Sequence, residues 1–334
     1  MNVHDALFKA TFSQVEHAAD LIRRNLPPAI VARMDFATLT LCKGSFVDEI
    51  LKERYTDLLF SVQIGSSTAF IYLLYEHQSG VDALMPFRLL RYEVRIWERF
   101  LTDHPDRNRL PAIVSVVVHH SATGWTAATS FDSLLDVDAQ ALSALGDHVP
   151  RQRFILDDLS VETNEGLRAR AMSALGRLVF LCLKNSRTPE ELLKNLRGWV
   201  DLVREVRRSP NGVAALIRIW RYILAVSERL DPEQVLEQLA KAVGEDGKEE
   251  VVTAADQLRE EGRKEGRKEG RKEGHKEGLQ EGQSKTLLKL LGVRFGPLPD
   301  AVVARVSTAA PALLEQWTEQ VLTASSLAEV LDKQ

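Results

Sequence analysis

The chain has 334 residues, of which 45% are hydrophobic and 27% are charged, and its formal net charge is −4. This composition is typical of globular proteins, and the small negative charge means that any contact with DNA would need a local basic surface. The sequence has no run of about 18 apolar residues that could span a membrane, and its start, MNVHDALFKATF, lacks the pattern of a signal peptide.

The two cysteines, Cys42 and Cys182, lie far apart and lack the spacing of a metal site. A disulfide framework is therefore not expected, and the predicted location is the reducing cytoplasm, with no membrane partner. At about 100 to 200 residues per domain, the length allows two or three domains.

Residues 1–160 mix the patterns of helices and strands. Apolar residues recur at helical spacing over residues 4–26, where a Pro-Pro pair ends the pattern. A short β-prone run follows at 36–42, and two richer runs at 57–64 and 68–78 are separated by Gly-Ser-Ser, which predicts a hairpin.

A helix is expected next at 85–101, and the apolar run at 112–119 predicts a strand that is buried on both faces. The order of these elements is α, β, β, β, α, β. It predicts an α/β core with a mixed sheet flanked by helices, followed by helical segments. The predicted divisions are a core at 1–160, a helical extension at 161–257, a repeat at 258–283 and a small helical domain at 284–334.

The repeat reads EGRK EGRK EGRK EGHK EGLQ EG over residues 261–282. On a helix, every i, i+4 relation within the EGRK units is like on like, which is unfavourable, and each glycine costs about 1 kcal/mol in a helix interior. A solvated, semi-flexible spacer is the favoured interpretation. The alternative is a glycine seam at which two helices approach closely, so that the repeat or the helical tail would form a homo-oligomer.

The predicted hairpin brings acidic residues together. With its turn centred between Ser66 and Ser67, Asp57 and Glu76 fall directly opposite each other, about 5 Å apart at Cβ, and Gln78 lies on the same face. Two carboxylates this close repel each other unless a cation lies between them, and Mg²⁺ prefers such oxygen ligands. These polar residues are also what the ends of any apolar hairpin would carry, so the pattern alone is a weak motif.

The helix predicted after the hairpin carries arginines at 88, 91, 95 and 99. A separate apolar face is expected at Leu84, Phe87, Leu90, Val94, Trp97 and Leu101. Arginine suits phosphate because its planar fork donates two parallel hydrogen bonds, so Arg88, Arg91 and Arg95 are candidate DNA-binding residues. A solvated face that is paired with Glu93 and Glu98 is the alternative.

Four short blocks together resemble a known family: HDALFK at 4–9, YTDLL at 55–59, YEHQS at 75–79 and MPFRLLRY at 85–92. Their order and wording are similar to those of the recombination-promoting nucleases, also described as YhgA-like transposases, a branch of the PD-(D/E)xK nuclease superfamily. The resemblance covers roughly residues 1–250. It implies a restriction-endonuclease-like core and a bacterial, Mg²⁺-dependent (or Mn²⁺-dependent) DNA endonuclease linked to recombination and mobile elements.

By this resemblance, Asp57 and Glu76 are the metal-binding acids, and Gln78 stands where the superfamily usually has lysine. Glutamine can orient a water molecule but supplies no positive charge, so the metal would carry more of the electrostatic work. His4, Asp5 and Lys9 match the N-terminal motif and are expected to line the site.

Two rival functions remain open at this point. The chain could be a catalytically weak DNA-binding or oligomerising protein with a transposase-like nuclease core. It could also be a true transposase, although transposases of the DDE kind use a different acidic triad on a ribonuclease-H-like sheet. Cleavage of DNA with Mg²⁺ or Mn²⁺, and its loss with a chelator, separates the first rival from the nuclease.

Overall fold

The computed structural model describes residues 2–42, 56–76, 81–244 and 247–331, and a few side chains within these ranges, including those of Asp57 and Glu76, are outside the description. The chain forms two compact units, Met1–Asp256 and Gln257–Gln334. Within the described residues, no helix is both long enough and apolar enough to cross a bilayer.

The first unit is built on one mixed sheet of five strands in the order β1-β2-β3-β4-β5. The β1–β2 and β2–β3 pairs are antiparallel, and the β3–β4 and β4–β5 pairs are parallel. The strands are β1 Met34–Leu41, β2 Thr56–Ile64, β3 Ser67–Glu76, β4 Ala112–His119 and β5 Ile155–Asp158. The predicted α/β fold with a mixed sheet, flanked by helices and followed by helical segments, is confirmed.

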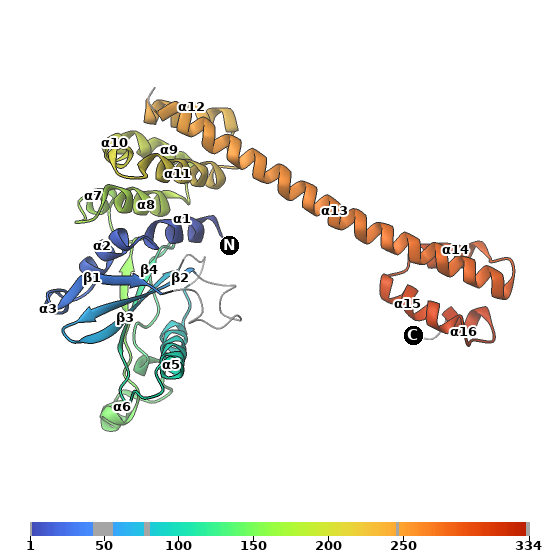
Figure 1. Ribbon diagram of the computed structural model, residues 1–334, viewed down its shortest axis with the longest axis horizontal. Coiled ribbons are helices and arrows are strands. Elements are labelled where there is room, and N and C mark those ends of the chain that lie inside the picture. Colours follow the sequence, from blue (N-terminus) through green and yellow to red (C-terminus); the bar gives the residue numbers. More distant parts are fainter. Residues whose placement is uncertain (1, 43–55, 77–80, 245–246, 332–334) are drawn as a thin grey trace. The chain divides into compact units, whose positions relative to one another are not determined.

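Helices cover both faces of this sheet (Figure 1). α1 (Val3–Phe12) and α2 (Val15–Asn25) lie on one face, and α5 (Met85–Asp103) lies on the other. Side chains alternate along the strands, so Leu58 and Phe60 pack towards α1 whereas Leu59 packs towards α5. From Ser115 to His119, β4 is buried on both faces, as its continuous apolar run predicts.

The single helix expected over residues 4–26 is in fact two helices. Ser13 ends α1 through its backbone N–H, which donates to the Lys9 carbonyl at 3.0 Å. Gln14 then adopts an extended backbone before α2 begins, and its side chain donates to the Ala10 carbonyl. The apolar period continues through this break, which explains why the sequence pattern does not reveal it.

The buried face of α5 differs from the predicted one. Its residues against the sheet are Met85, Pro86, Leu89, Tyr92, Glu93 and Ile96. Four residues of the predicted apolar face are exposed instead: Leu84, Phe87, Val94 and Leu101. The helix is apolar on two sides, and the side that carries Tyr92 packs on the sheet. The Tyr92 ring lies 5.8 Å from the ring of Tyr72 in β3, measured between centroids.

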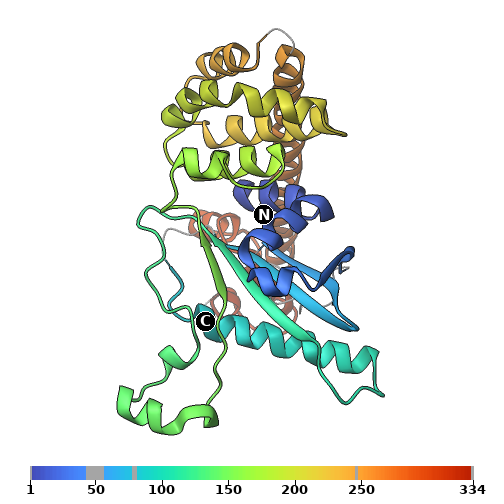
Figure 2. The same ribbon diagram turned by 90° about the vertical axis from the view of Figure 1, so that its left-hand side faces the viewer.

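The helices after residue 160 stack on α1 and α2 rather than forming a separate core. They are α7 Asn164–Arg168, α8 Ala174–Asn185, α9 Pro189–Leu196, α10 Val200–Arg208, α11 Gly212–Val226 and α12 Pro232–Val243. Figure 2 shows α7 to α11 as light-green to yellow layers beyond the blue N-terminal helices, and α12 in orange beyond them. One hydrophobic cluster runs from the sheet through α1 to these helices, and the whole stretch belongs to the first unit.

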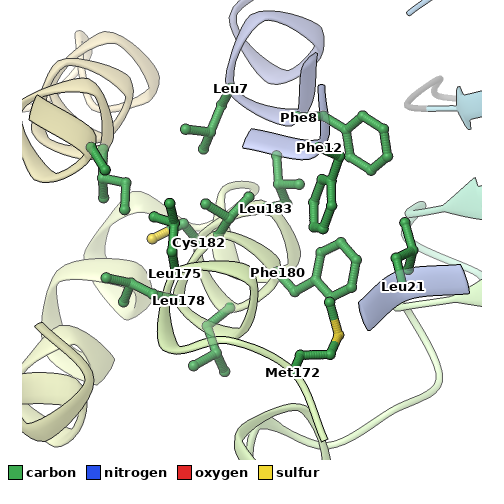
Figure 3. Close-up of a cluster of buried hydrophobic side chains, with 14 of the residues drawn as sticks. Leu7, Phe8, Phe12, Leu21, Met172, Leu175, Leu178, Phe180, Cys182 and Leu183 are labelled. Carbon is green, nitrogen blue, oxygen red and sulfur yellow. The ribbon is translucent and has the colours of Figure 1, made fainter. Parts of the chain in front are cut away.

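Aromatic side chains join α1 to α8 at the centre of this cluster (Figure 3). The rings of Phe8 and Phe12 lie 4.6 Å apart, and Phe12 lies 5.0 Å from Phe180. All three side chains are fully buried. Such contacts bury large apolar areas and favour tilted ring geometries, so α1 is the middle layer between the sheet and the later helices.

A buried ion network closes the same face of the sheet. The Arg170 guanidinium donates to both carboxylate oxygens of Asp157, at 2.7 and 2.9 Å, and also to Glu162. Asn25 of α2 donates to Asp157 at 3.1 Å. This network ties β5 to α2 and to the chain that leads into α8.

The second unit contains most of α13 (Lys248–Phe295) together with α14 Asp300–Ser307, α15 Pro311–Gln320 and α16 Leu327–Leu331. Leu287, Leu291, Leu314 and Trp317 lie in its small core. The repeat is helical throughout, in contrast to the favoured interpretation as a semi-flexible spacer. Its glycines have open space around them, and the exposed pair Glu260–Lys264 joins the residue before the repeat to its first EGRK unit.

Candidate active site at the carboxyl edge of the sheet

Three parallel strands end at one edge of the sheet. β3, β4 and β5 run in the same direction, so their carboxyl ends, Glu76, His119 and Asp158, meet there. β2 is antiparallel to β3 and therefore begins at this edge, close to Asp57. Ligands of open α/β sheets bind beyond the carboxyl ends of the strands, which makes this edge the candidate site.

The register of the hairpin corrects the predicted pairing of the two acids. Asp57 lies opposite Leu74, not opposite Glu76. The turn consists of Gly65 and Ser66, with Ile64 paired to Ser67, because Gly65 supplies the positive φ of 62° that a tight hairpin turn requires. The predicted turn was therefore centred one residue too late.

This correction shifts the pairing by two residues, so it leaves the predicted face unchanged. Leu74 and Glu76 are two positions apart on β3, and Asp57 is opposite Leu74. The backbone positions of Asp57 and Glu76 are thus diagonal neighbours on one face, typically about 7–8 Å apart. It is the face that packs on α5, because Leu59 and Leu74 both belong to that cluster.

The same row continues across the next two strands. Glu76 pairs with His119, and His119 pairs with Asp158. The His119 side chain is fully buried and meets the Trp125 ring edge-on, with centroids 5.0 Å apart. Asp158 accepts hydrogen bonds from the backbone N–H groups of Trp125, at 2.7 Å, and Ser160, at 2.9 Å, so its carboxylate orders the loop that leaves the sheet.

The start of α1 reaches this part of the molecule through His4. Asn2 caps the helix by accepting from the His4 backbone N–H at 3.2 Å. The His4 ring forms a hydrogen bond of 2.8 Å between Nδ1 and the Tyr222 hydroxyl of α11. Burial, with a contribution from the charge of Arg187, lowers the pKa of His4 to about 4, so the ring is neutral at pH 7.

His120, the residue after β4, has a similar environment. It is 3% exposed, and burial lowers its pKa to about 4, with further contributions from Arg187, Lys184, His119 and His4. Arg187, Lys184, His119 and His4 therefore all lie within electrostatic range of His120. His4, His119 and His120 come from two segments that the sequence separates by more than 100 residues.

The other two residues of the N-terminal motif differ in exposure. Asp5 is half-buried, whereas Lys9 is exposed and lies more than one helical turn beyond His4. Of the three residues expected to line the site, His4 contacts a distant part of the chain.

The predicted arginine ridge of α5 is largely neutralised by acids. Arg88 donates to Asp82 at 2.6 Å, and Arg95 and Arg99 pair with Glu98 and Asp103 at 3.1 and 2.9 Å. Arg91 is exposed. The three candidate DNA-binding residues therefore remain a prediction, with two of them already engaged in ion pairs.

The side chains of Asp57 and Glu76, and the whole of Gln78, lie outside the described residues. Among the residues that are described, no three His, Cys, Asp or Glu side chains are grouped so that they could hold a metal ion. For Asp57 and Glu76, the structure shows the backbone position at the carboxyl edge.

Sequence reasoning missed His119, His120, Lys184, Arg187 and Tyr222 at this edge. The strand AIVSVVVH ends in two adjacent histidines, and polar residues directly after a buried strand are a signal that could have identified them. Lys184, Arg187 and Tyr222 come from helices whose pattern gives no such signal.

Comparison with known proteins places the chain among named relatives. A family model described as “Putative transposase, YhgA-like” matches residues 2–214. The chain is 28% identical over 260 residues to the recombination-promoting nuclease RpnA of Escherichia coli (strain K12), which covers 78% of this chain and 84% of that protein. No solved structure matches it.

Other relatives carry related names. The “Inactive recombination-promoting nuclease-like protein RpnE” of the same strain is 27% identical over 262 residues, covering 78% of this chain and 82% of that protein. The recombination-promoting nuclease RpnD of Escherichia coli O157:H7 is 35% identical over 119 residues, covering 36% and 45%. Because the family match spans more than half of the sequence, the chain belongs to the YhgA-like transposase family.

Proposed function

We propose that this chain is a metal-dependent DNA endonuclease of the PD-(D/E)xK type that acts in recombination. The observation that carries the proposal is the register of β2 and β3, which puts Asp57 and Glu76 on adjacent strands, on one face, at the carboxyl edge. The relatives named recombination-promoting nucleases support the choice of reaction.

The donor set at this edge fits a hard divalent cation such as Mg²⁺ or Mn²⁺. Asp57 and Glu76 supply carboxylate oxygens, which Mg²⁺ prefers, and two carboxylates at neighbouring positions favour a cation between them. When bound, such an ion supplies Lewis-acid stabilisation of a phosphodiester and a more acidic water. Asp57 and Glu76 would hold the ion in place.

Gln78 would orient the attacking water through its side-chain amide. An amide can accept a hydrogen bond and donate two, but it carries no charge and takes no proton. In this role it positions the nucleophile without acting as a general base. Among the described residues at this edge, the fully buried His119 pairs with Glu76 in the strand register.

Replacement of Asp57 by alanine tests the metal-binding acid. Asp57→Ala should lower the rate of plasmid nicking with Mg²⁺ by about a thousandfold or more, since a bound ion contributes several kcal/mol to the transition state. Asp106→Ala is the matched control because Asp106 is an exposed loop residue. Nicking by Asp57→Ala at the wild-type rate would contradict the proposal.

A second pair of variants separates holding the ion from orienting water. Glu76→Ala should abolish Mn²⁺ binding measured by calorimetry. Gln78→Ala should retain the binding while the cleavage rate drops by about a hundredfold, the cost of losing one oriented polar group. Loss of Mn²⁺ binding in Gln78→Ala would assign Gln78 to the metal instead.

The alternative is a DNA-binding or oligomerising protein without cleavage. One observation favours it: a relative named inactive is almost as similar to this chain as one named a nuclease, at 27% against 28% identity. Purified wild-type protein that binds duplex DNA but leaves plasmid uncut with either Mg²⁺ or Mn²⁺ would establish this alternative.

A further inference from the structure

The helices after residue 160 bring cations to the candidate edge. Lys184, in the last turn of α8, donates from Nζ to the carbonyls of Leu159 and Ser160, both at 3.1 Å. These two residues directly follow Asp158, the end of β5. Leu159 in turn donates its N–H to the His119 carbonyl at 2.9 Å, so Lys184 is fixed to the loop that lies against the site.

Arg187 lies just beyond α8, on a segment of backbone that the core holds. Ser186, which precedes it, is buried and donates from Oγ to the Leu183 carbonyl at 2.8 Å. The Ser186 side chain also lies close to the Tyr222 hydroxyl, the same hydroxyl that contacts His4. A short chain of contacts therefore connects the backbone beside Arg187 to the start of α1.

The Arg187 side chain is exposed although its backbone is anchored. Its positive charge contributes to the lowered pKa of both His4 and His120, which places it near both rings. Among the described residues, no carboxylate forms an ion pair with it. The neighbouring histidines are neutral at pH 7, so Arg187 and Lys184 are the local positive charges.

This arrangement differs from that of the arginines on α5. Arg88, Arg95 and Arg99 are each paired with an acid, and a paired guanidinium must exchange its partner before it can bind a phosphate. The Arg187 guanidinium forms no such ion pair among the described residues. A guanidinium binds phosphate oxygens through two parallel hydrogen bonds. Lys184 uses two of its three ammonium donors on carbonyls, and one donor remains.

We propose that Arg187, supported by Lys184, forms a phosphate-binding subsite for the DNA backbone beside the carboxyl edge of the sheet. The ligand is a backbone phosphate of the same duplex, bound on the α1 side of the edge and not on the α5 face that carries Asp57 and Glu76, so the helical extension adds a DNA contact to those of the sheet core. This inference rests on the proposed nuclease function. It makes Arg187 a substrate-binding residue and leaves the chemical step to the acids.

The experiment uses full-length protein and a fluorescein-labelled 20-base-pair duplex. Binding is measured by anisotropy in chelator over a series of salt concentrations, and plasmid nicking is measured with Mg²⁺ or Mn²⁺. The variants are Arg187→Ala, Arg187→Lys and the control Arg208→Ala, which removes one exposed arginine from α10 in the same unit. Circular dichroism checks that each variant is folded.

Arg187→Ala should weaken binding by about tenfold, the value of one charge-assisted contact. It should also reduce the slope of log K against log salt by about one, since one phosphate contact is lost. In nicking, KM should rise more than kcat falls. Arg187→Lys should keep the salt slope but lose part of the affinity, and Arg208→Ala should match the wild type.

Three negative results have different meanings. If wild-type protein binds and cuts DNA and Arg187→Ala does both with unchanged affinity and salt slope, the subsite is refuted and the nuclease proposal stands. If wild-type protein neither binds the duplex nor nicks plasmid, the nuclease proposal and the subsite are both refuted. An equal loss in Arg187→Ala and Arg208→Ala would refute the subsite in favour of a diffuse charge effect.

Discussion

The first unit and the repeat segment of α13 both contain salt bridges, but in opposite surroundings. In the first unit, the Arg170 side chain is 1% exposed and bonds Asp157, which is 5% exposed. At the start of the repeat, the Lys264 and Glu260 side chains are 69% and 66% exposed, although they also form an ion pair. The geometry of a salt bridge is thus similar in both regions, and its burial is not.

This difference decides what each pair contributes. A buried ion that loses its partner cannot regain its hydration, so breaking a buried pair is strongly destabilising. An exposed pair exchanges its partner for water and is screened by salt. The comparison teaches that charge pattern in the sequence does not reveal which acids hold the fold together.

The largest expected effect follows from removing the buried guanidinium. Arg170→Met should lower the free energy of unfolding by about 3–5 kcal/mol, because Asp157 would remain buried without its cation. Chemical denaturation at pH 7 measures it. Arg24→Met is the control, since the Arg24 side chain is 38% exposed and only reaches Glu162 at 3.4 Å, and its effect should stay below about 1 kcal/mol.

The double variant Asp157→Asn with Arg170→Met tests whether the cost comes from the unpaired charge. It should be more stable than Arg170→Met alone, since no charge is then left buried. If the unfolding free energy of Arg170→Met were within about 1 kcal/mol of that of the wild type, the buried salt bridge would contribute no more to stability than an exposed one.

A buried acid that pairs with no cation among the described residues gives a smaller effect of opposite sign. Glu93 of α5 is 4% exposed and accepts hydrogen bonds at Oε1 from Ser115 Oγ, at 2.7 Å, and Gln152 Nε2, at 2.9 Å. Burial raises the pKa of Glu93, and the two hydrogen bonds only partly oppose this. The protonated form is therefore favoured by folding.

The pH dependence has a definite sign. Because the folded pKa lies above the ordinary value of 4.5, the stabilisation from protonated Glu93 is full below 4.5 and is lost as the pH rises through the folded pKa. Glu93→Gln should therefore be more stable than wild type at pH 8, and this advantage should shrink as the pH falls towards 4.5. Denaturation of both proteins across this range measures it.

An exposed acid on the same helix provides the control for Glu93. Glu98→Gln removes a charge whose side chain is 59% exposed, so its stability difference from wild type should change little with pH. If Glu93→Gln were the less stable protein at pH 8, the charged form of Glu93 would be the one that the fold favours.

The smallest expected effects lie in the repeat. Gly266→Ala, Gly270→Ala and Gly274→Ala place a methyl group in open space, and each should stabilise the helix by about 0.5–1 kcal/mol. Circular dichroism should show a higher melting temperature for α13. Gly296→Ala is the control with the opposite sign, because its φ of 83° is strained for alanine.

These glycine variants also separate the two interpretations of the repeat. If the glycines form a seam for close helix approach, alanine would block the contact and sedimentation would show smaller assemblies. If they only extend the helix, the assembly state should not change. A loss of assembly would contradict the stabilising role that we predict for alanine.

Much of the fold could be predicted because strand and helix patterns are local. The strands at 57–64, 68–78 and 112–119 lie close to β2, β3 and β4. The phase of α5 could not be predicted, because the helix carries apolar residues on two sides and only the sheet selects between them. The buried Glu93 also looks like a surface residue in the sequence.

The site could be predicted only in part, for a related reason. The face shared by Asp57 and Glu76 follows from alternation along the strands and survives the corrected turn, whereas their direct pairing does not. Tyr222 and Arg187 approach the edge through packing of α8 and α11 on α1. No local sequence pattern indicates such a long-range contact.

The contact between His4 and Tyr222 spans 218 residues of sequence, and this has a consequence for synthesis. The first helix leaves the ribosome early, but its covering layers, α8 and α11, follow only after the entire sheet. Contacts of such high sequence separation form late because closing a long loop is slow. A nascent chain that stops before α11 therefore lacks the Tyr222 contact, and the packing beside the carboxyl edge is complete only when the first unit is almost fully translated.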